Sequence, residues 1–188
     1  MTAVSLKKIL RDANKNNYAV AGLVVLAWDD ALAFTKAADE TGMPIILQAG
    51  PSCRAHTPVP LLGKMFRYLA SQTKTHVCCH IDHGYTFREC EEGIDSGFTS
   101  VMFDGSKLSL KDNIKITSKI VKKAHDAKVS VEGEIGFVGY ANGKSSEGTL
   151  PKEAITFAKE SSVDAIAISV GNTHLQTQAS AIIDEVLV

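Results

Sequence analysis

The stretch Val77-Cys-Cys-His-Ile-Asp-His-Gly84 decides how this sequence is interpreted. It begins as an apolar run with the character of a buried strand, and it closes with a carboxylate and an imidazole, Asp82 and His83. Polar residues also end or follow three later apolar runs: Asp104 in VMFDGS, Glu134 in VEGEIG and His174 in AIAISVGNTH. Imidazole and carboxylate groups bind divalent ions in catalytic sites. The sequence therefore predicts a metal site built from the ends of several strands.

Apolar, β-branched runs alternate with segments of helical periodicity along the chain. Strands are expected at residues 18–26, 44–50, 76–82, 99–104, 129–136 and 164–171. Helices are expected at residues 6–13, 29–41, 58–72, 87–96, 110–127 and 151–161, with the start of another at 179–188. No Pro/Ser-rich linker interrupts the pattern, so residues 1–188 are expected to form a single domain.

This alternation predicts a parallel sheet covered by helices, for which two architectures remain open. Six strands fit a doubly wound sheet, because a (β/α)₈ barrel needs eight strands and typically about 250 residues. The polar residues favour the barrel, since a barrel brings the carboxyl ends of all its strands around one opening. A doubly wound sheet would concentrate its site at one switch point instead.

The motifs HIDHG, SVMFDGS, VEGEIGFVGY and AISVGNTH, in this order and spacing, resemble those of the class II, zinc-dependent ketose-bisphosphate aldolases. This family contains the fructose- and tagatose-bisphosphate aldolases, and the resemblance extends from Tyr18 to His174. It implies a TIM (β/α)₈ barrel and a homo-oligomer. It also implies that this chain supplies about six βα units and is truncated before the last two strands.

The resemblance implies a lyase that cleaves or forms a carbon–carbon bond of a phosphorylated ketose, with triose-phosphate or aldehyde products. Such a reaction passes through an enediolate, whose negative charge a divalent cation stabilises. His83 and His174 match two zinc histidines of the family, whose third lies on a strand that this chain lacks. Glu134 and Asp104 match acids at an alternative or second cation position. Asp82 matches the catalytic aspartate, which exchanges a proton with the oxygen that becomes the aldehyde carbonyl.

Other positions match the family less closely. Glu147 is the one carboxylate in the polar loop 139–149, where the family carries the base that deprotonates the ketose. The resemblance implies substrate contacts at Ser52, Gly139 and Gly171, with Arg54 also close in sequence to the phosphate contact. Leu175 replaces a glycine that helps to form a monovalent-cation and phosphate site. These departures indicate a divergent subgroup.

Composition excludes several other classes of protein. The formal net charge is −1 and no block of Lys and Arg occurs, which argues against a nucleic-acid partner. There is no secretory apolar segment and no run of about 18 apolar residues that would span a membrane. The four cysteines form no CxxC pair and are expected to be reduced thiols of a cytoplasmic protein: Cys53, Cys78, Cys79 and Cys90.

Two alternative functions remain beside the aldolase. One is a noncatalytic, aldolase-like companion subunit or degenerate fragment that stabilises a partner, although Asp82, His83 and Glu134 are all present. The other is a different metal-dependent barrel enzyme, such as a sugar isomerase.

Overall fold

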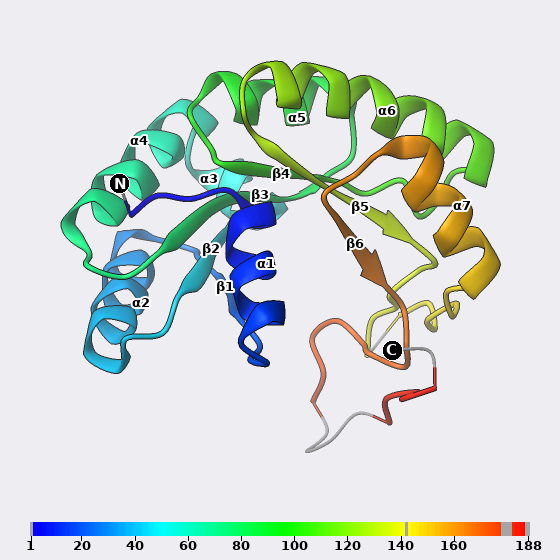
Figure 1. Cartoon of the computed structure of the whole chain (residues 1–188), viewed down its shortest axis with the longest axis horizontal. Helices are drawn as coiled ribbons and strands as arrows, with labels where there is room; N and C mark the ends of the chain where they lie inside the picture. The colour runs from blue at the N-terminus through cyan, green and yellow to red at the C-terminus, as the bar shows by residue number, and fades with distance from the viewer. Residues whose placement is uncertain (1, 142, 178–181, 187–188) are drawn as a thin grey trace.

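The computed structural model of the chain, which describes residues 2–141, 143–177 and 182–186, contains one parallel sheet of six strands (Figure 1). The strands are β1 (Ala21–Val24), β2 (Ile45–Ala49), β3 (Val77–Gly84), β4 (Ser100–Phe103), β5 (Ser130–Ile135) and β6 (Ala165–Ile168). The helices are α1 (Leu6–Lys15), α2 (Trp28–Thr41), α3 (Pro51–His56), α4 (Val59–Gln72), α5 (Phe87–Asp95), α6 (Leu110–Asp126) and α7 (Pro151–Ser161). No described helix combines the length and the apolar content that crossing a bilayer requires.

The order of the strands separates the two architectures. The strands lie side by side as β1-β2-β3-β4-β5-β6, in the order of the chain, and this order does not reverse at any point across the sheet. A doubly wound sheet needs such a reversal at its switch point, whereas a barrel does not. The sheet is curled, and α4, α5, α6 and α7 follow its convex side (Figure 1). The fold is therefore an incomplete TIM barrel, as the positions of the polar residues predicted.

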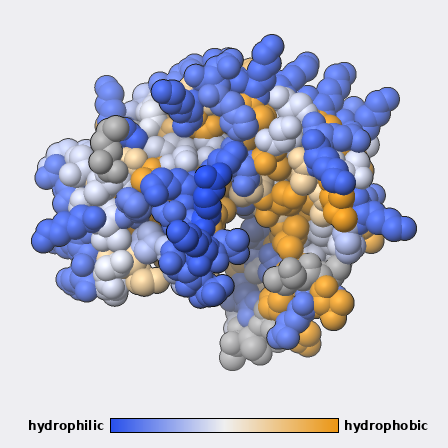
Figure 2. Space-filling model, in the orientation of Figure 1, coloured by the Kyte–Doolittle hydropathy of each residue, from blue (hydrophilic) through white to orange (hydrophobic). Residues whose placement is uncertain are grey.

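The main core lies between the sheet and the outer helices. Strand residues such as Leu47, Ile81 and Val101 are fully buried there, and they pack with helix residues such as Phe66 and Ile120. Alternate strand residues point to the opposite, concave side, where the polar groups gather. Figure 2 shows hydrophilic residues over the outer helices and apolar residues beside β6, on the open side of the half-barrel.

Helix α1 lies on the concave side, at the amino ends of the strands (Figure 1). Leu6 and Ile9 are buried there with Ile46 and Cys78, which face inward from β2 and β3. The Nζ atom of Lys7 also donates to Asp164 just before β6, at 2.9 Å. Helix α1 therefore covers the amino end of the half-barrel and not the carboxyl ends of the strands.

Three details differ from the sequence-based expectations. The first and last strands are shorter than predicted, at Ala21–Val24 and Ala165–Ile168. Helix α3 was not predicted, because its six residues are too few to show helical periodicity; Pro51 occupies its first turn. The helix predicted at 179–188 is wrong where it is described, since residues 182–186 are irregular or form a turn. The backbone N–H of Asp184 instead donates to the Val170 carbonyl at 2.7 Å; residues 179–181 and 187–188 lie outside the described part.

Candidate metal centre and proton-transfer site

A bulge at the end of β3 sets the directions of Asp82 and His83. Ile81 pairs with Val101 and Gly84 pairs with Phe103, so β3 uses one residue more than β4 over this interval. His83 takes up the extra length with a left-handed backbone, at φ 50°. A bulge of this kind changes the direction of a side chain at the rim of a barrel. The two neighbouring side chains can therefore both serve one site, although a regular strand would send them to opposite faces.

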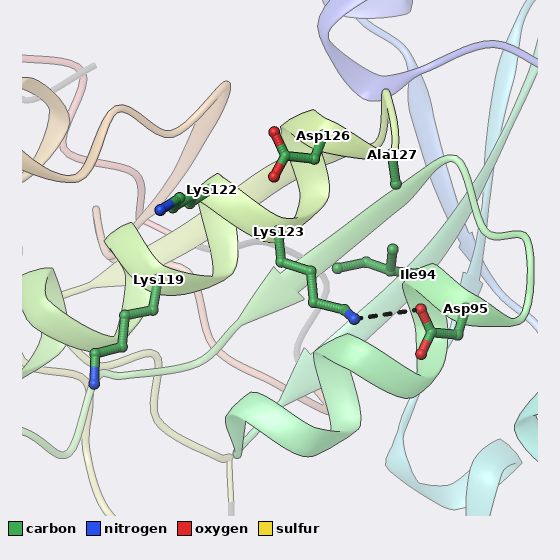
Figure 3. Close-up of a pocket in the computed structure, with 7 residues that line it drawn as sticks. All are labelled: Ile94, Asp95, Lys119, Lys122, Lys123, Asp126 and Ala127. Carbon is green, nitrogen blue, oxygen red and sulfur yellow. Dashed lines mark ion pairs between the residues drawn. The ribbon is translucent and has the colours of Figure 1, made fainter.

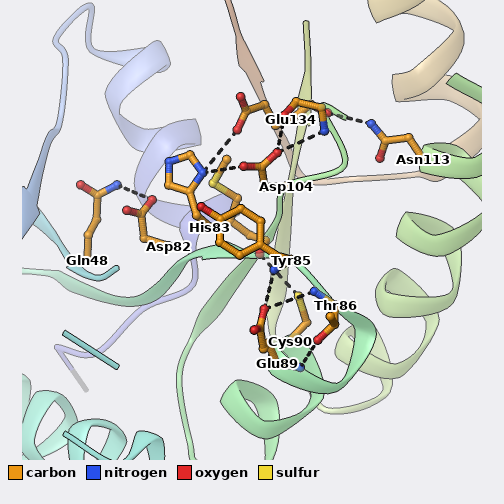
Figure 4. A network of polar contacts seen from close by, with 12 residues as sticks. Gln48, Asp82, His83, Tyr85, Thr86, Glu89, Cys90, Asp104, Asn113 and Glu134 are labelled. Atoms are coloured by element: carbon orange, nitrogen blue, oxygen red, sulfur yellow. Dashed lines mark hydrogen bonds and ion pairs between the residues drawn. The ribbon is translucent and has the colours of Figure 1, made fainter. Parts of the chain in front are cut away.

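His83 meets two carboxylates that come from the next two strands (Figure 4). Its Nδ1 atom lies 3.0 Å from Oδ2 of Asp104, which follows β4, and 3.5 Å from Oε2 of Glu134 on β5. One ligand atom from each of the three residues lies within 4.8 Å of the other two. We call these three residues the His83 cluster.

Burial and mutual charge set the protonation of this cluster. Burial alone would lower the pKa of His83, but the hydrogen bond with Asp104 and the surrounding carboxylates outweigh it and raise the pKa to about 9. Burial, followed by repulsion from Asp104, raises the pKa of Glu134 to about 7. The cluster thus holds protons in positions that a cation would occupy.

The cluster fits a divalent cation. Oε2 of Glu134 is buried and, beside its 3.5 Å ion-pair contact with His83, forms no hydrogen bond within the described structure. Ligand atoms around a tetrahedral zinc with bonds of 2.0–2.1 Å are about 3.3 Å apart, close to the separations between His83 and its two acids. One imidazole nitrogen with two carboxylate oxygens suits Zn²⁺ and other first-row divalent ions.

Asp104 is oriented by a short turn after β4. Its Oδ1 atom accepts from the backbone N–H of Ser106 at 3.1 Å and from the Ser106 hydroxyl at 2.6 Å. Burial would raise the pKa of Asp104, yet the hydrogen bonds from His83 and Ser106 outweigh it and lower the pKa. Asp104 is therefore ionised and presents its other oxygen to His83.

Asn113, on α6, fixes the backbone at Glu134. Its Nδ2 atom donates to the Glu134 carbonyl at 2.8 Å, and its Oδ1 atom accepts from the Thr117 hydroxyl at 3.0 Å. The side chain fits against Gly105, where an added Cβ would lie 2.2 Å from Oδ1 of Asn113. This buried amide connects the outer helix α6 to β5, the strand that carries Glu134.

We expect Asn113→Ala to lower the free energy of unfolding by about 1–3 kcal/mol, because it leaves the Glu134 carbonyl and the Thr117 hydroxyl without their partner. Urea unfolding followed by circular dichroism measures this change. The control is Asn14→Ala, at an exposed position of α1. Equal unfolding free energies for the two variants would show that the buried amide contributes nothing.

Asp82 lies beside the cluster, on the side of β2 (Figure 4). Its Oδ1 atom accepts from Nε2 of Gln48 at 3.4 Å, and a Cβ added at Gly50 would lie 3.5 Å from Oδ2. Burial raises the pKa of Asp82, against the opposing charges of His83 and Arg54. A carboxyl group whose pKa is shifted towards neutrality is suited to proton transfer.

His174 comes from the loop after β6 and lies next to His83, with 5.1 Å between the ring centroids. Its backbone N–H donates to the Gly139 carbonyl at 2.8 Å, and its ring lies 5.0 Å from that of Tyr140. The structure thus brings together four predicted metal ligands from four different βα units: His83, Asp104, Glu134 and His174. The predicted substrate position Gly139 also lies here, through its bond to His174.

The remaining predicted positions are not brought into the cluster. Glu147 is exposed, its carboxylate pairs with Lys144 at 2.8 Å, and no described contact joins it to His83. Ser52 is exposed on α3. Gly171 lines a cavity of about 520 Å³ between the loops after β5 and β6, which Tyr140 also lines. The roles given to these residues remain predictions.

A second polar pair lies deeper in the concave side. His80 is fully buried, and its Nε2 atom is 3.4 Å from Oε2 of Glu132. Burial lowers the pKa of His80 to about 3 and raises the pKa of Glu132 to about 7. Glu132 and Glu134 are two residues apart on β5 and share one strand face, but Glu132 faces His80 while Glu134 faces His83.

A surface groove lies at the opposite end of the strands from the His83 cluster. A groove of about 500 Å³ runs between α5 and α6 and contains Lys119, Lys122 and Lys123 (Figure 3). It includes Asp95 and Ala127, at the ends of these helices that lead into the next strands. The groove is therefore near the amino ends of the strands, whereas the His83 cluster lies at their carboxyl ends.

Residues 4–187 match the sequence model of the family described as fructose-bisphosphate aldolase, class II. The chain belongs to this family. The resemblance seen in the sequence motifs is thereby confirmed. The chain is also 34% identical over 183 residues to the fructose-bisphosphate aldolase of Staphylococcus epidermidis, a match covering 93% of this chain and 63% of that aldolase.

Two more relatives give the same result. The fructose-bisphosphate aldolase of Helicobacter pylori is 34% identical over 174 residues, covering 89% of this chain and 57% of its own. The class 2 fructose-bisphosphate aldolase of Synechocystis is 34% identical over 203 residues, a match covering 93% of this chain and 55% of that aldolase. The chain thus spans between 55% and 63% of the length of these aldolases.

Solved structures support the fold. The YdjI aldolase of Escherichia coli K12 superposes with a TM-score of 0.86 at 24% identity, covering 98% of this chain and 67% of that protein. The fructose-bisphosphate aldolase of Campylobacter jejuni superposes with a TM-score of 0.76 at 23% identity, covering 95% of this chain and 61% of that protein. At these identities the likeness establishes the curled βα architecture of the aldolase family.

Proposed function

We propose that this chain carries the cation site and the proton-transfer group of a class II aldolase that acts on a phosphorylated ketose. The observation that carries the proposal is the meeting of His83, Asp104 and Glu134 beside Asp82, in a chain of the aldolase family. The fructose- and tagatose-bisphosphate aldolases suggest the class of substrate. We further propose a single domain in a cytoplasmic homo-oligomer.

Each residue has a defined part in the proposed reaction. His83, Asp104 and Glu134, with His174 beside them, hold the cation, which we propose is Zn²⁺. When bound, it supplies Lewis-acid stabilisation of the negative charge that develops on the ketose oxygens. Asp82 exchanges a proton with the oxygen that is a hydroxyl in the ketose bisphosphate and a carbonyl in the aldehyde product.

The proposal is tested by metal binding and by product analysis. The purified chain is dialysed against Zn²⁺, its metal content is measured, and it is incubated with fructose and tagatose bisphosphates. We expect one bound ion per chain and release of triose phosphate. An isomerised sugar without cleavage would favour the isomerase, and a chain with neither stoichiometric metal nor cleavage would favour the companion subunit.

Cation binding is expected to strengthen as the pH rises from about 6 to about 8. The pKa values of Glu134, about 7, and of His83, about 9, are both raised in the folded protein, so binding must displace protons. Calorimetry with Co²⁺ in buffers of different ionisation enthalpy should record proton release at about pH 7.5. An affinity that is independent of pH, without proton release, would contradict this protonation scheme.

A further inference from the structure

We propose that Arg54 is a positioning residue that holds the bulge carrying Asp82 and His83 in the geometry needed for cation binding. The inference rests on the proposed function, which it deepens by assigning a role to a side chain outside the His83 cluster. Arg54 lies on α3, the short helix after β2, and its side chain reaches across to the end of β3.

The guanidinium of Arg54 donates to three backbone carbonyls. Nη1 donates to Ala49 at 2.6 Å and to Asp82 at 2.5 Å, while Nη2 donates to His83 at 2.9 Å. The sequence placed Arg54 near a phosphate contact, but in the structure both terminal nitrogens are engaged with the backbone. Its contacts therefore favour support of the site over direct contact with substrate.

These carbonyls lie where regular strand pairing ends. The ladder between β2 and β3 finishes at Ala49 and Ile81, and the ladder between β3 and β4 shifts its register between Ile81 and Gly84. Asp82 and His83 are the residues inside that interval. A half-buried carbonyl at such a point needs a donor from outside the ladder, and Arg54 supplies one to each of the two residues.

His83 also needs support because its backbone is strained. A non-glycine residue with φ 50° is in the left-handed region, which persists where the surrounding structure enforces it. The guanidinium donates to the carbonyls of two successive peptide groups, Asp82–His83 and His83–Gly84, which lie on either side of the His83 Cα, and it thereby fixes the orientation of both peptide planes. Those planes determine where the Asp82 carboxylate and the His83 imidazole point.

The planar guanidinium suits this task better than an ammonium group. Arginine presents five N–H donors in a rigid fork, whereas lysine presents one compact charge on a flexible chain. Helix α3 orients the guanidinium, since the buried Cys53 packs the helix against the core and the Arg54 backbone N–H donates to the Gly50 carbonyl at 3.0 Å. Arg54→Lys therefore keeps the positive charge but removes the planar arrangement of N–H donors that contacts the three carbonyls.

The decisive variant is Arg54→Lys, compared with Arg11→Lys at an exposed position of α1. Calorimetry measures the Co²⁺ affinity of the full chain, visible absorption reports the ligand geometry around Co²⁺, and urea unfolding reports stability. Loss of a group that orients a metal ligand lowers metal affinity by about 10–100-fold. We expect a loss in that range and a changed Co²⁺ spectrum for Arg54→Lys, and wild-type values for Arg11→Lys.

A folded Arg54→Lys chain with wild-type Co²⁺ affinity and spectrum would overturn the inference while leaving the proposed function intact. A wild-type chain that binds no Co²⁺ would overturn both. If Arg54→Lys does not fold, NMR of the Arg54 guanidinium in the wild-type chain tests whether its Nη groups are held by the two carbonyls. Slowly rotating Nη groups with couplings to the Asp82 and His83 carbonyl carbons are expected, and a freely rotating guanidinium would refute the inference.

Discussion

His83→Ala is expected to lower the affinity of the chain for Zn²⁺ by more than about 100-fold, because loss of a direct ligand should exceed the 10–100-fold effect of losing an outer-shell partner. His83 supplies the imidazole nitrogen of the cluster, and its Nδ1 atom lies within 3.5 Å of both carboxylates. Without His83, the cluster offers a cation only the carboxylate oxygens of Asp104 and Glu134, and these two acids repel each other. Equilibrium dialysis followed by metal analysis measures the loss.

The matched control is His56→Ala. His56 is exposed at the end of α3, and its ring contacts the hydroxyl of Thr57. We expect this control to bind Zn²⁺ as the wild-type chain does. If His83→Ala and His56→Ala bound Zn²⁺ equally well, the cation would have to be held elsewhere.

Asp82→Asn is expected to slow retro-aldol cleavage by about 10²–10⁴-fold, the usual contribution of a positioned general acid or base. Asparagine preserves the volume and can keep the contact with Gln48, but it cannot exchange a proton. Asp82 is outside the His83 cluster, so the variant should still bind one cation. A turnover assay for triose phosphate, together with metal analysis, separates these two effects.

Asp126→Asn is the control for this change, because Asp126 is an exposed carboxylate at the end of α6. It should retain wild-type turnover. If Asp82→Asn, with its cation bound, cleaved substrate as fast as this control, Asp82 could not be the proton-transfer group.

The sequence predicted the architecture because strand ends carry a recognisable pattern. Apolar runs closed by Asp82, Asp104 and Glu134 indicated that several carboxyl ends meet at one opening, and the strand order agrees. The direction of His83 could not be predicted. In a regular strand His83 and Asp82 would face opposite sides, and only the bulge at φ 50° brings both to one site.

Residues that support the site were missed for a related reason. Asn113 is one polar residue within an amphipathic helix, and nothing in its local sequence shows that it reaches the Glu134 carbonyl. Gln48 is separated from Asp82 by 34 positions, so their contact depends on the pairing of β2 with β3. Arg54 was expected near the phosphate contact from its place in the sequence, whereas its partners are carbonyl oxygens whose positions the fold determines.

The most direct test is X-ray diffraction from crystals of the chain grown with Zn²⁺, recorded on both sides of the zinc absorption edge. We expect an anomalous peak within bonding distance, about 2.0–2.2 Å, of the His83 imidazole and of at least one carboxylate from Asp104 or Glu134. Asp82 should lie beside that peak. Zinc bound only at other positions, with His83 still hydrogen-bonded to Asp104, would show that the His83 cluster is not the cation site.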